Sequence, residues 1–162
     1  MIMVFLILMI FGSKKVSSLD VLKYYSDKLV LEHYEEATGM VGLWESEKVV
    51  FQRSIKDKCA QLLEIGCGTG RISFGLSQLG YAKITATDFS KKMIIRAKEL
   101  NENYKTKIDF QKQDAMTLTF KEGEFGAVIF GFNGLMQIPG QLNRRKAMEE
   151  SYRVLILSLI HI

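Results

Sequence analysis

The segment from Leu62 to Gly70 constrains the fold of this 162-residue chain more than any other feature. A short apolar run in it is followed at once by glycine at every second position, namely Gly66, Gly68 and Gly70. Glycines spaced in this way let the backbone turn sharply and approach a ligand closely. We expect the N–H groups of such a loop, and the N-terminus of a helix that begins directly after it, to face whatever binds there. The segment therefore predicts a strand, a binding loop and a helix, although a tight turn without a ligand would use the same residues.

Short apolar segments alternate with amphipathic segments through the rest of the chain. This alternation predicts one parallel α/β sheet flanked by helices. The fourth apolar segment is apolar on both faces, as a central parallel strand must be. The predicted strands are 62–65, 83–87, 108–111 and 127–130. The first predicted helix is 71–79, and the second begins after Ser90, which caps it, and buries Met93, Ala97 and Leu100. The last predicted helix is 142–155, with Met148, Tyr152 and Leu155 facing inward.

Two further helical patterns, 19–36 and 45–55, precede the first strand. We expect them to lie across the top of the sheet as a helical cap of residues 18–60, ahead of a binding domain of residues 61–156. The apolar run Met1–Phe11 is too short for a membrane span and lacks the features of a cleaved signal peptide. We interpret residues 1–17 as an extension from a mis-assigned start codon, with an uncleaved signal anchor as the alternative. The tail 157–162 resembles a translated sequencing adapter, and a genuine apolar strand is the alternative.

Acidic residues follow the second and third predicted strands. Asp88 lies 20 residues beyond Gly68, the spacing at which an acid in a βαβ unit accepts hydrogen bonds from ribose hydroxyls. A helix cap or a turn would also explain this aspartate. Asp114, in the sequence Gln-Asp-Ala, follows the third strand. The dinucleotide fingerprint would need a glycine where this chain has Arg71, and this disfavours a nicotinamide cofactor.

Residues Leu62–Gly70 resemble motif I of the class I S-adenosylmethionine-dependent methyltransferases, which has an acidic residue, any residue and then alternating glycines. The resemblance covers about residues 62–155 and implies a Rossmann-like sheet of order 3-2-1-4, lacking the family's C-terminal strands. It also implies S-adenosylmethionine as the cofactor. The contacts that it implies are Glu64 near the amino group, Gly66, Cys67 and Gly68 at the methionine moiety, and Gly70 in the same cofactor-binding loop. It further implies Asp88 at the ribose, Phe89 and Met93 beside the adenine, Asp114 and Ala115 at the adenine edge, and Phe130 near the sulfonium.

The loop after the fourth strand, 130–136, shows which methyltransferases this chain does not resemble. It lacks the Pro-Pro-aromatic signature of enzymes that methylate amino groups of nucleic acids, and no Pro-Cys nucleophile is present. Asn133 is a candidate substrate contact or an ordinary loop residue. His33 is a candidate general base or a surface histidine, and Tyr24, Tyr25, Tyr34 and Trp44 are candidates for a substrate pocket or for packing. We assign no catalytic residue.

Composition limits the partners. The net charge of +4 is too small and too evenly spread to indicate a nucleic-acid binder. Two cysteines, Cys59 and Cys67, form neither a metal-binding spacing nor a disulfide framework, so we expect no metal and a cytoplasmic location. The sequence favours methyl transfer to a small-molecule nucleophile. The alternatives are a nicotinamide-dependent oxidoreductase and a non-catalytic remnant that binds the cofactor. An open fourth strand also leads us to expect a marginally stable, aggregation-prone chain.

Overall fold

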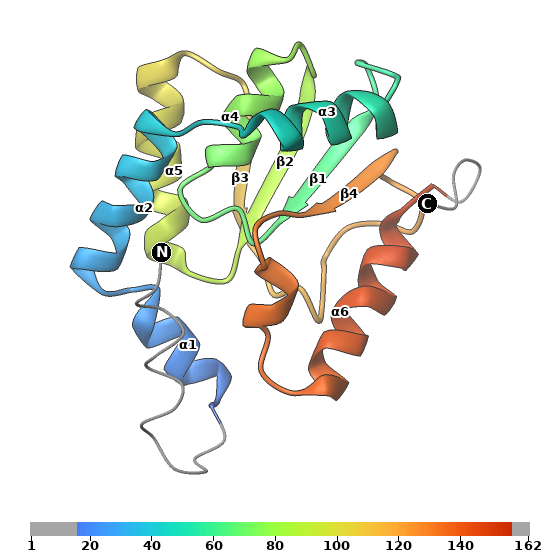
Figure 1. The fold of residues 1–162 in the computed structure, drawn as a ribbon. Helices are drawn as coiled ribbons and strands as arrows, with labels where there is room; N and C mark the ends of the chain where they lie inside the picture. The colour runs from blue at the N-terminus through green and yellow to red at the C-terminus, as the bar shows by residue number, and fades with distance from the viewer. Residues whose placement is uncertain (1–15, 157–162) are drawn as a thin grey trace.

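The computed structural model describes residues 16–156, so the interpretations of Met1–Phe11 and of the tail 157–162 fall outside the described residues. The described chain forms a parallel sheet with helices on both faces (Figure 1). Its elements are α1 (Ser18–Tyr24), α2 (Lys28–Met40), α3 (Glu45–Ser54), β1 (Gln61–Ile65), α4 (Arg71–Gln78), β2 (Lys83–Asp88), α5 (Lys91–Tyr104), β3 (Asp109–Lys112), β4 (Ala127–Phe130), the 3₁₀ turn η2 (Gly134–Gln137) and α6 (Gln141–Val154).

The strand order is β3-β2-β1-β4, which confirms the predicted order and the parallel arrangement. The register places Ile65 opposite both Thr87 and Phe130, and Asp88 opposite Lys112. The four strands therefore end together at one edge of the sheet, the lower edge in Figure 1, next to α1 and η2. In open parallel sheets this carboxyl edge is where ligands bind.

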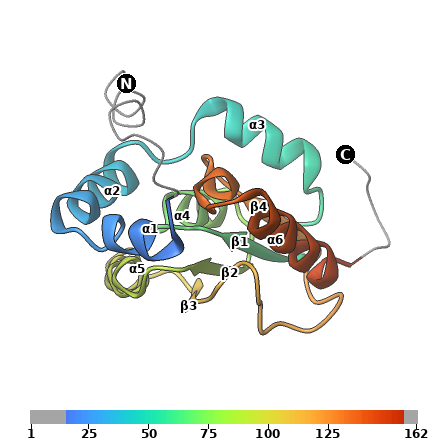
Figure 2. The ribbon, with the colours of Figure 1, turned by 90° about the horizontal axis from the view of Figure 1, so that it is seen from below.

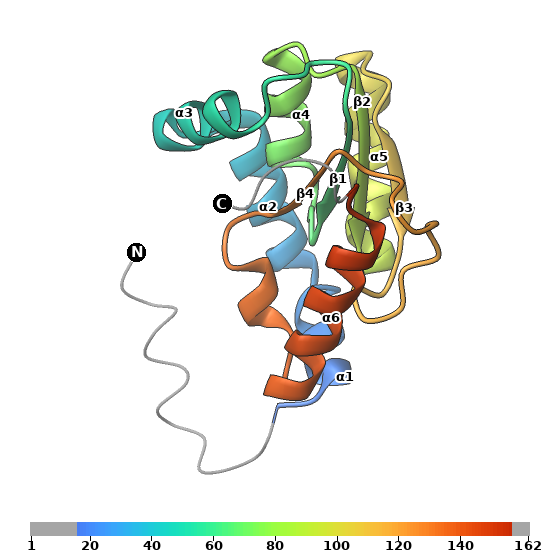
Figure 3. The same ribbon diagram turned by 90° about the vertical axis from the view of Figure 1, so that its right-hand side faces the viewer.

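Each face of the sheet carries its own apolar core. On one face, α4 and α5 pack against the strands, and Figure 3 shows α2, α3 and α4 together on one side of the sheet. On the other face, Val154 of α6 packs with Leu63, Ile65 and Phe125. The predicted inward face of the last helix is wrong, because Met148 and Tyr152 are exposed while Ala147, Ser151 and Val154 are buried. Small side chains at these positions let the helix lie close to the sheet.

The predicted helix 19–36 is two helices. Asp27 caps α2 by accepting a hydrogen bond from the Leu29 N–H at 2.9 Å, and this interrupts the helix after Tyr24. Viewed from the carboxyl edge, α1 lies between α2 and α5 (Figure 2). Leu43, between α2 and α3, fills the space above Gly75, where a Cβ atom would come within 2.2 Å of it. No helix within residues 16–156 is long and apolar enough to span a bilayer.

Backbone carbonyls hold α1, α2 and α3 on the rest of the molecule. Side chains from the α/β part donate hydrogen bonds to carbonyl oxygens of the helices and their connections. The pairs are Ser90 to Tyr25, Lys92 to Ser26, Thr69 to Tyr34, Arg71 to Gly42, and Tyr81 to both Phe51 and Ile55, at 2.6–3.3 Å. Two ion pairs between side chains also connect these parts: Arg71 of α4 pairs with Glu47 of α3, and Arg96 of α5 pairs with Glu35 of α2.

Beyond β4, the chain begins to extend the sheet. Leu155 forms an isolated parallel bridge with Phe125, and the Ile156 N–H donates to the Phe125 carbonyl at 2.8 Å. Within the described residues β4 is an edge strand. An open apolar edge favours pairing between molecules, so the marginal solubility expected from the sequence stays a prediction.

Candidate cofactor site

The glycine loop is folded back onto the end of β2. The N–H groups of Gly66 and Cys67 both donate to the Thr87 carbonyl, at 2.8 and 2.9 Å. The Gly68 N–H donates to Oδ2 of Asp88 at 2.9 Å. These bonds require left-handed backbone at Gly66 and Gly68, with φ of 75° and 56°. The expectation that these N–H groups face a ligand is therefore wrong, and contacts from these three residues fall to their carbonyl oxygens and Cα hydrogens.

Glu64 places a carboxyl group beneath this loop. Its side chain is 2% exposed, and the Ser73 hydroxyl donates a hydrogen bond to Oε2. Burial raises the pKa of Glu64 to about 7, against the opposing effects of the Ser73 bond and the Arg71 charge. A carboxyl group with such a pKa ionises readily when a cation approaches, so this position suits a cationic ligand group.

Asp88 lies at the carboxyl end of β2 with both oxygens engaged. Oδ2 accepts from Gly68, and Oδ1 accepts from the Ser90 N–H at 2.8 Å. Burial raises the pKa of Asp88, while these two backbone hydrogen bonds act in the opposite direction. Two carboxylate oxygens together offer about four lone pairs. Asp88 therefore keeps the capacity to accept two more hydrogen bonds, as two neighbouring hydroxyls of a ribose would supply.

The turn after β3 is joined to the same edge. The Gln113 N–H donates to the Asp88 carbonyl at 3.1 Å, which carries Asp114 and Ala115 to the neighbourhood of Asp88. Oδ1 of Asp114 accepts from the Met116 N–H at 2.9 Å, and both Asp114 and Ala115 are half-buried. Contact of these two residues with an adenine ring stays a prediction.

Four other predicted site residues are placed mainly by packing. Met93 is 1% exposed in the first turn of α5. Phe130 packs on the core cluster of α6, and Phe89 is half-buried after β2. Gly70 has a φ of 98°, and a Cβ atom there would lie 2.8 Å from the Phe110 ring and 2.9 Å from the Phe74 ring. The structure therefore brings Gly68 and Asp88 into direct contact and attaches the Asp114 turn to them. Gly70 is needed for a separate reason, because a side chain there would collide with the rings of Phe74 and Phe110.

Tyr34 reaches the glycine loop from α2. A Cβ atom on Gly68 would lie 3.3 Å from its ring, and the Tyr34 carbonyl accepts from the Thr69 hydroxyl at 2.9 Å. Burial is the largest cause that raises the pKa values of Tyr25 and Tyr34, and the charge of Asp88 adds to both. No feature of the sequence separates Tyr34 from the neighbouring tyrosines. Its place on the loop was therefore not predictable.

Arg71 explains why a large residue follows the last glycine. Its guanidinium group points to the N-terminal helices, forming two hydrogen bonds of 2.7 Å with Glu47 and one of 2.6 Å with the Gly42 carbonyl. Hydrogen bonds from Arg71 and Trp44 lower the pKa of Glu47, although its largest single influence, burial, acts to raise it. Arg71 thus fixes the connection between α2 and α3 beside the loop.

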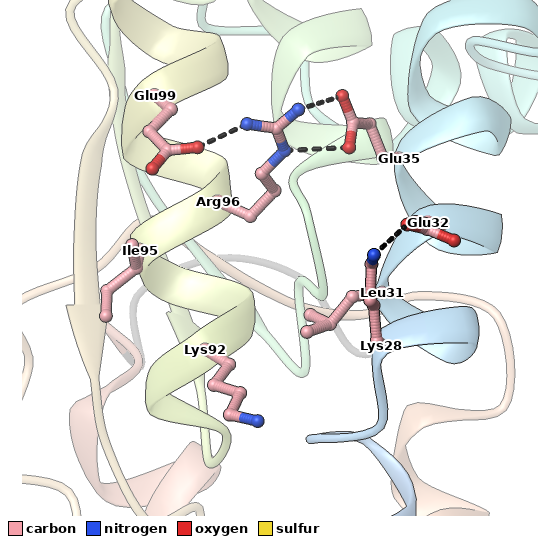
Figure 4. Close-up of a pocket in the computed structure, with 8 residues that line it drawn as sticks. All are labelled: Lys28, Leu31, Glu32, Glu35, Lys92, Ile95, Arg96 and Glu99. Carbon is pink, nitrogen blue, oxygen red and sulfur yellow. Dashed lines mark hydrogen bonds and ion pairs between the residues drawn. The ribbon is translucent and has the colours of Figure 1, made fainter.

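A hollow of about 350 Å³ lies elsewhere, between α2 and α5 (Figure 4). Arg96 crosses it, pairing with Glu35 and Glu99, while Lys28 pairs with Glu32. None of the predicted site residues lines this hollow. No group of His, Cys, Asp and Glu within residues 16–156 is arranged to hold a metal ion.

Comparison with known proteins decides the family. The methyltransferase-domain family matches residues 62–156, which is more than half of the chain. The chain belongs to this family. The matched residues begin within β1 and include the glycine loop, Asp88 and Asp114. S-adenosylmethionine is the cofactor that membership of this family implies.

Relatives with curated functions act on different substrates. The chain is 38% identical over 97 residues to the demethylmenaquinone methyltransferase of Lactococcus lactis, a match covering 58% of the chain and 37% of that protein. It is 27% identical over 118 residues to the eEF1A lysine and N-terminal methyltransferase of Bos taurus, covering 73% and 16%. The chain thus spans well under half of the length of these relatives.

Solved structures share the fold. A putative S-adenosyl-L-methionine-dependent methyltransferase from Methanococcus maripaludis superposes with a TM-score of 0.67 at 19% identity, covering 80% of this chain and 59% of that one. A SAM-dependent methyltransferase from Methanosarcina mazei gives a TM-score of 0.58 at 28% identity, covering 71% and 54%. The Rossmann-like class predicted from the sequence is confirmed.

Proposed function

We propose that this chain binds S-adenosylmethionine at the carboxyl edge of its sheet and serves methyl transfer to a small-molecule nucleophile. The observation that carries the proposal is the convergence of Glu64, Gly68 and Asp88 on this edge. The side chains there fit the cofactor by their chemistry. Glu64 is a buried carboxyl group suited to a cation, and Asp88 has free acceptor capacity for a pair of hydroxyls.

Each residue has a distinct task in this proposal. Glu64 complements the positive charge of the cofactor's amino acid portion, Asp88 accepts from the ribose, and Asp114 with Ala115 meets the adenine. The helix α2 packs beside α4 and α5 and brings the Tyr34 ring against Gly68, and in this proposal it helps to exclude water from the site. The bound cofactor supplies a methyl group that its sulfonium makes electrophilic. The protein then mainly holds the acceptor close and in line, an entropic contribution of about 7 kcal/mol or more in well-oriented reactions.

The proposal does not include a catalytic base. His33 is exposed on α2, and its ring lies edge-on to that of Tyr34 with centroids 6.1 Å apart. Small-molecule transfer is favoured over protein methylation by the higher identity to the demethylmenaquinone enzyme. The nicotinamide alternative is disfavoured, because Arg71 occupies the third glycine position and fills the space beside the loop with its contacts to Glu47.

Isothermal titration calorimetry with S-adenosylhomocysteine and with NADH tests the proposal. We expect saturable binding of S-adenosylhomocysteine at one site per chain and no heat of binding with NADH. Binding of NADH without binding of S-adenosylhomocysteine would reject the proposal in favour of the oxidoreductase alternative.

A further inference from the structure

Two aromatic side chains stand exposed beside the glycine loop. Trp44, at the start of α3, is 46% exposed, and Phe132, two residues beyond β4, is 58% exposed. Their rings meet edge to face, with centroids 5.5 Å apart and planes at 86°. Large aromatic side chains contribute most to packing and to interfaces when their apolar surface is buried. A paired but exposed arrangement therefore leaves apolar surface available to a third ring.

The loop that carries Phe132 is fixed in an unfavourable conformation. Phe132 and Asn133 both have positive φ, at 35° and 62°. A bulky residue such as Phe132 rarely adopts this backbone, which persists only where the surroundings impose it. Here Gly131 is pressed against Ile72, where a Cβ atom would come within 2.1 Å, and the Gly134 N–H closes the turn on the Gly131 carbonyl. The strained turn displays Phe132 outward instead of letting it fold into the core.

The same turn touches the candidate cofactor site. A Cβ atom on Gly131 would lie 3.7 Å from Oε1 of Glu64, and one on Gly66 would lie 3.7 Å from the Gly134 Cα. The aromatic pair thus stands next to the turn that contacts Glu64 and Gly66, with Phe132 supplied by the β4 loop and Trp44 by the start of α3.

Arg71 determines which ligands this surface favours. Its guanidinium carbon lies 5.4 Å from the Trp44 ring centroid and 5.9 Å from the Phe132 centroid. Glu47 holds the guanidinium in place, and the Arg71 side chain is 14% exposed. The guanidinium already occupies the cation–π position on both rings, and Glu47 balances its charge, so a second cation such as a lysine ammonium group finds no free cation–π position there. The ring surface that stays exposed suits a planar ring without positive charge.

We propose that Trp44 and Phe132 form the binding surface for the methyl acceptor, and that this acceptor is a planar aromatic compound without positive charge. This inference rests on the proposed function and goes further by naming the acceptor class. Trp44 and Phe132 are its specificity-determining residues, and Arg71 is a positioning residue that holds Trp44 beside Phe132.

Calorimetry with the full chain, saturated with S-adenosylhomocysteine, tests the inference with three probes: 2-naphthol as the planar ring, cis-decalin-2-ol as a non-planar compound of similar size, and Nα-acetyl-lysine amide as the cation. We expect 2-naphthol to bind most tightly. Trp44→Leu and Phe132→Leu should each weaken it about fivefold or more, the loss expected for one aromatic contact. Tyr152→Leu, which removes an exposed ring from α6, should leave binding unchanged.

Retained binding of S-adenosylhomocysteine shows that each variant is folded, and Phe132→Leu keeps the test decisive if Trp44→Leu unfolds. Equal binding of 2-naphthol and the decalinol, or no effect of the two substitutions, would overturn the inference while leaving the cofactor proposal standing. Tighter binding of the lysine derivative would overturn it in favour of a protein substrate. Absence of S-adenosylhomocysteine binding to the unmodified chain would overturn the proposed function and this inference with it.

Discussion

The carboxylate of Asp88 is held by the backbone N–H of Gly68, 20 residues earlier in the chain, at 2.9 Å. This single bond joins the glycine loop to the end of the neighbouring strand. It fixes the direction in which the remaining lone pairs of the carboxylate are presented.

Replacing Asp88 by asparagine should weaken S-adenosylhomocysteine binding about tenfold to a hundredfold. The amide has one acceptor oxygen where the carboxylate has two, so it cannot serve Gly68, Ser90 and a ligand at once, and hydrogen bonds to charged groups contribute about 1.5–3 kcal/mol. Calorimetric titration measures the change. Asp109→Asn, an exposed aspartate at the opposite end of β3, is the matched control and should bind as the unmodified chain does. Equal affinity of both variants would contradict the role given to Asp88.

Glu64 should make the stability of the fold depend on pH. Its pKa is raised to about 7 in the folded chain from an ordinary value of 4.5, so the unfolded chain loses this proton first as pH rises. The free energy of unfolding therefore falls by about 3 kcal/mol in total as the pH rises from about 4.5 to about 7. Glu64→Gln should remove this loss and be more stable than the unmodified chain at pH 8.

Urea unfolding at pH 5 and pH 8 measures this difference for both proteins. Other groups titrate in the same range, so the comparison is between the two proteins at each pH. A Glu64→Gln variant that is no more stable than the unmodified chain at pH 8 would show that Glu64 does not resist ionisation in the fold.

Two glycines with similar backbone angles should respond differently to alanine. Gly70 has a φ of 98° and faces the rings of Phe74 and Phe110, whereas Gly80 has a φ of 89°, and a methyl group added there would meet nothing within 4 Å. Gly80→Ala should cost about 1 kcal/mol from backbone conformation alone. Gly70→Ala should cost about 1–3 kcal/mol more, because the methyl group overpacks the aromatic cluster. Thermal unfolding provides the comparison, and equal losses would show that the rings move aside freely.

The Arg71–Glu47 pair should contribute more to stability than exposed ion pairs do. The two side chains are 14% and 16% exposed, and the guanidinium binds both carboxylate oxygens. Arg71→Lys keeps the charge but loses this paired geometry, and we expect a loss of about 1–2 kcal/mol in urea unfolding. Arg145→Lys, whose pair with Glu149 is 76% and 59% exposed, should change stability by less than about 0.5 kcal/mol. The opposite ranking would mean that Arg71 is not held as the structure shows.

The sheet was predictable because its signals are local. Short apolar runs located all four strands to within one residue at every boundary, and the oxygen of Ser90 caps α5 as predicted. Asp88 was predictable from spacing because consecutive parallel strands end at the same edge. Its bond to Gly68 was not predictable, because spacing does not say which backbone group a carboxylate accepts from.

The errors arise where tertiary packing overrides apolarity. In α6, Ala147 and Ser151 face the sheet although Met148 and Tyr152 are larger and more apolar, because only small side chains fit at this distance. The division between α1 and α2 follows from a local bond of Asp27 that competes with helical continuity. Trp44 and Phe132 come together from segments 88 positions apart, and no local pattern encodes that pairing.

Many of the hydrogen bonds that attach the N-terminal helices are made to their main chain. Peptide carbonyls of these helices and their connections accept from Ser90, Lys92, Thr69, Arg71 and Tyr81. Every amino acid supplies a peptide carbonyl. Exchanging residues such as Tyr24 or Leu29, which point into solvent, leaves those acceptors in place. Redesign of the outer surface for new ligands can therefore proceed without re-engineering how the helices are seated.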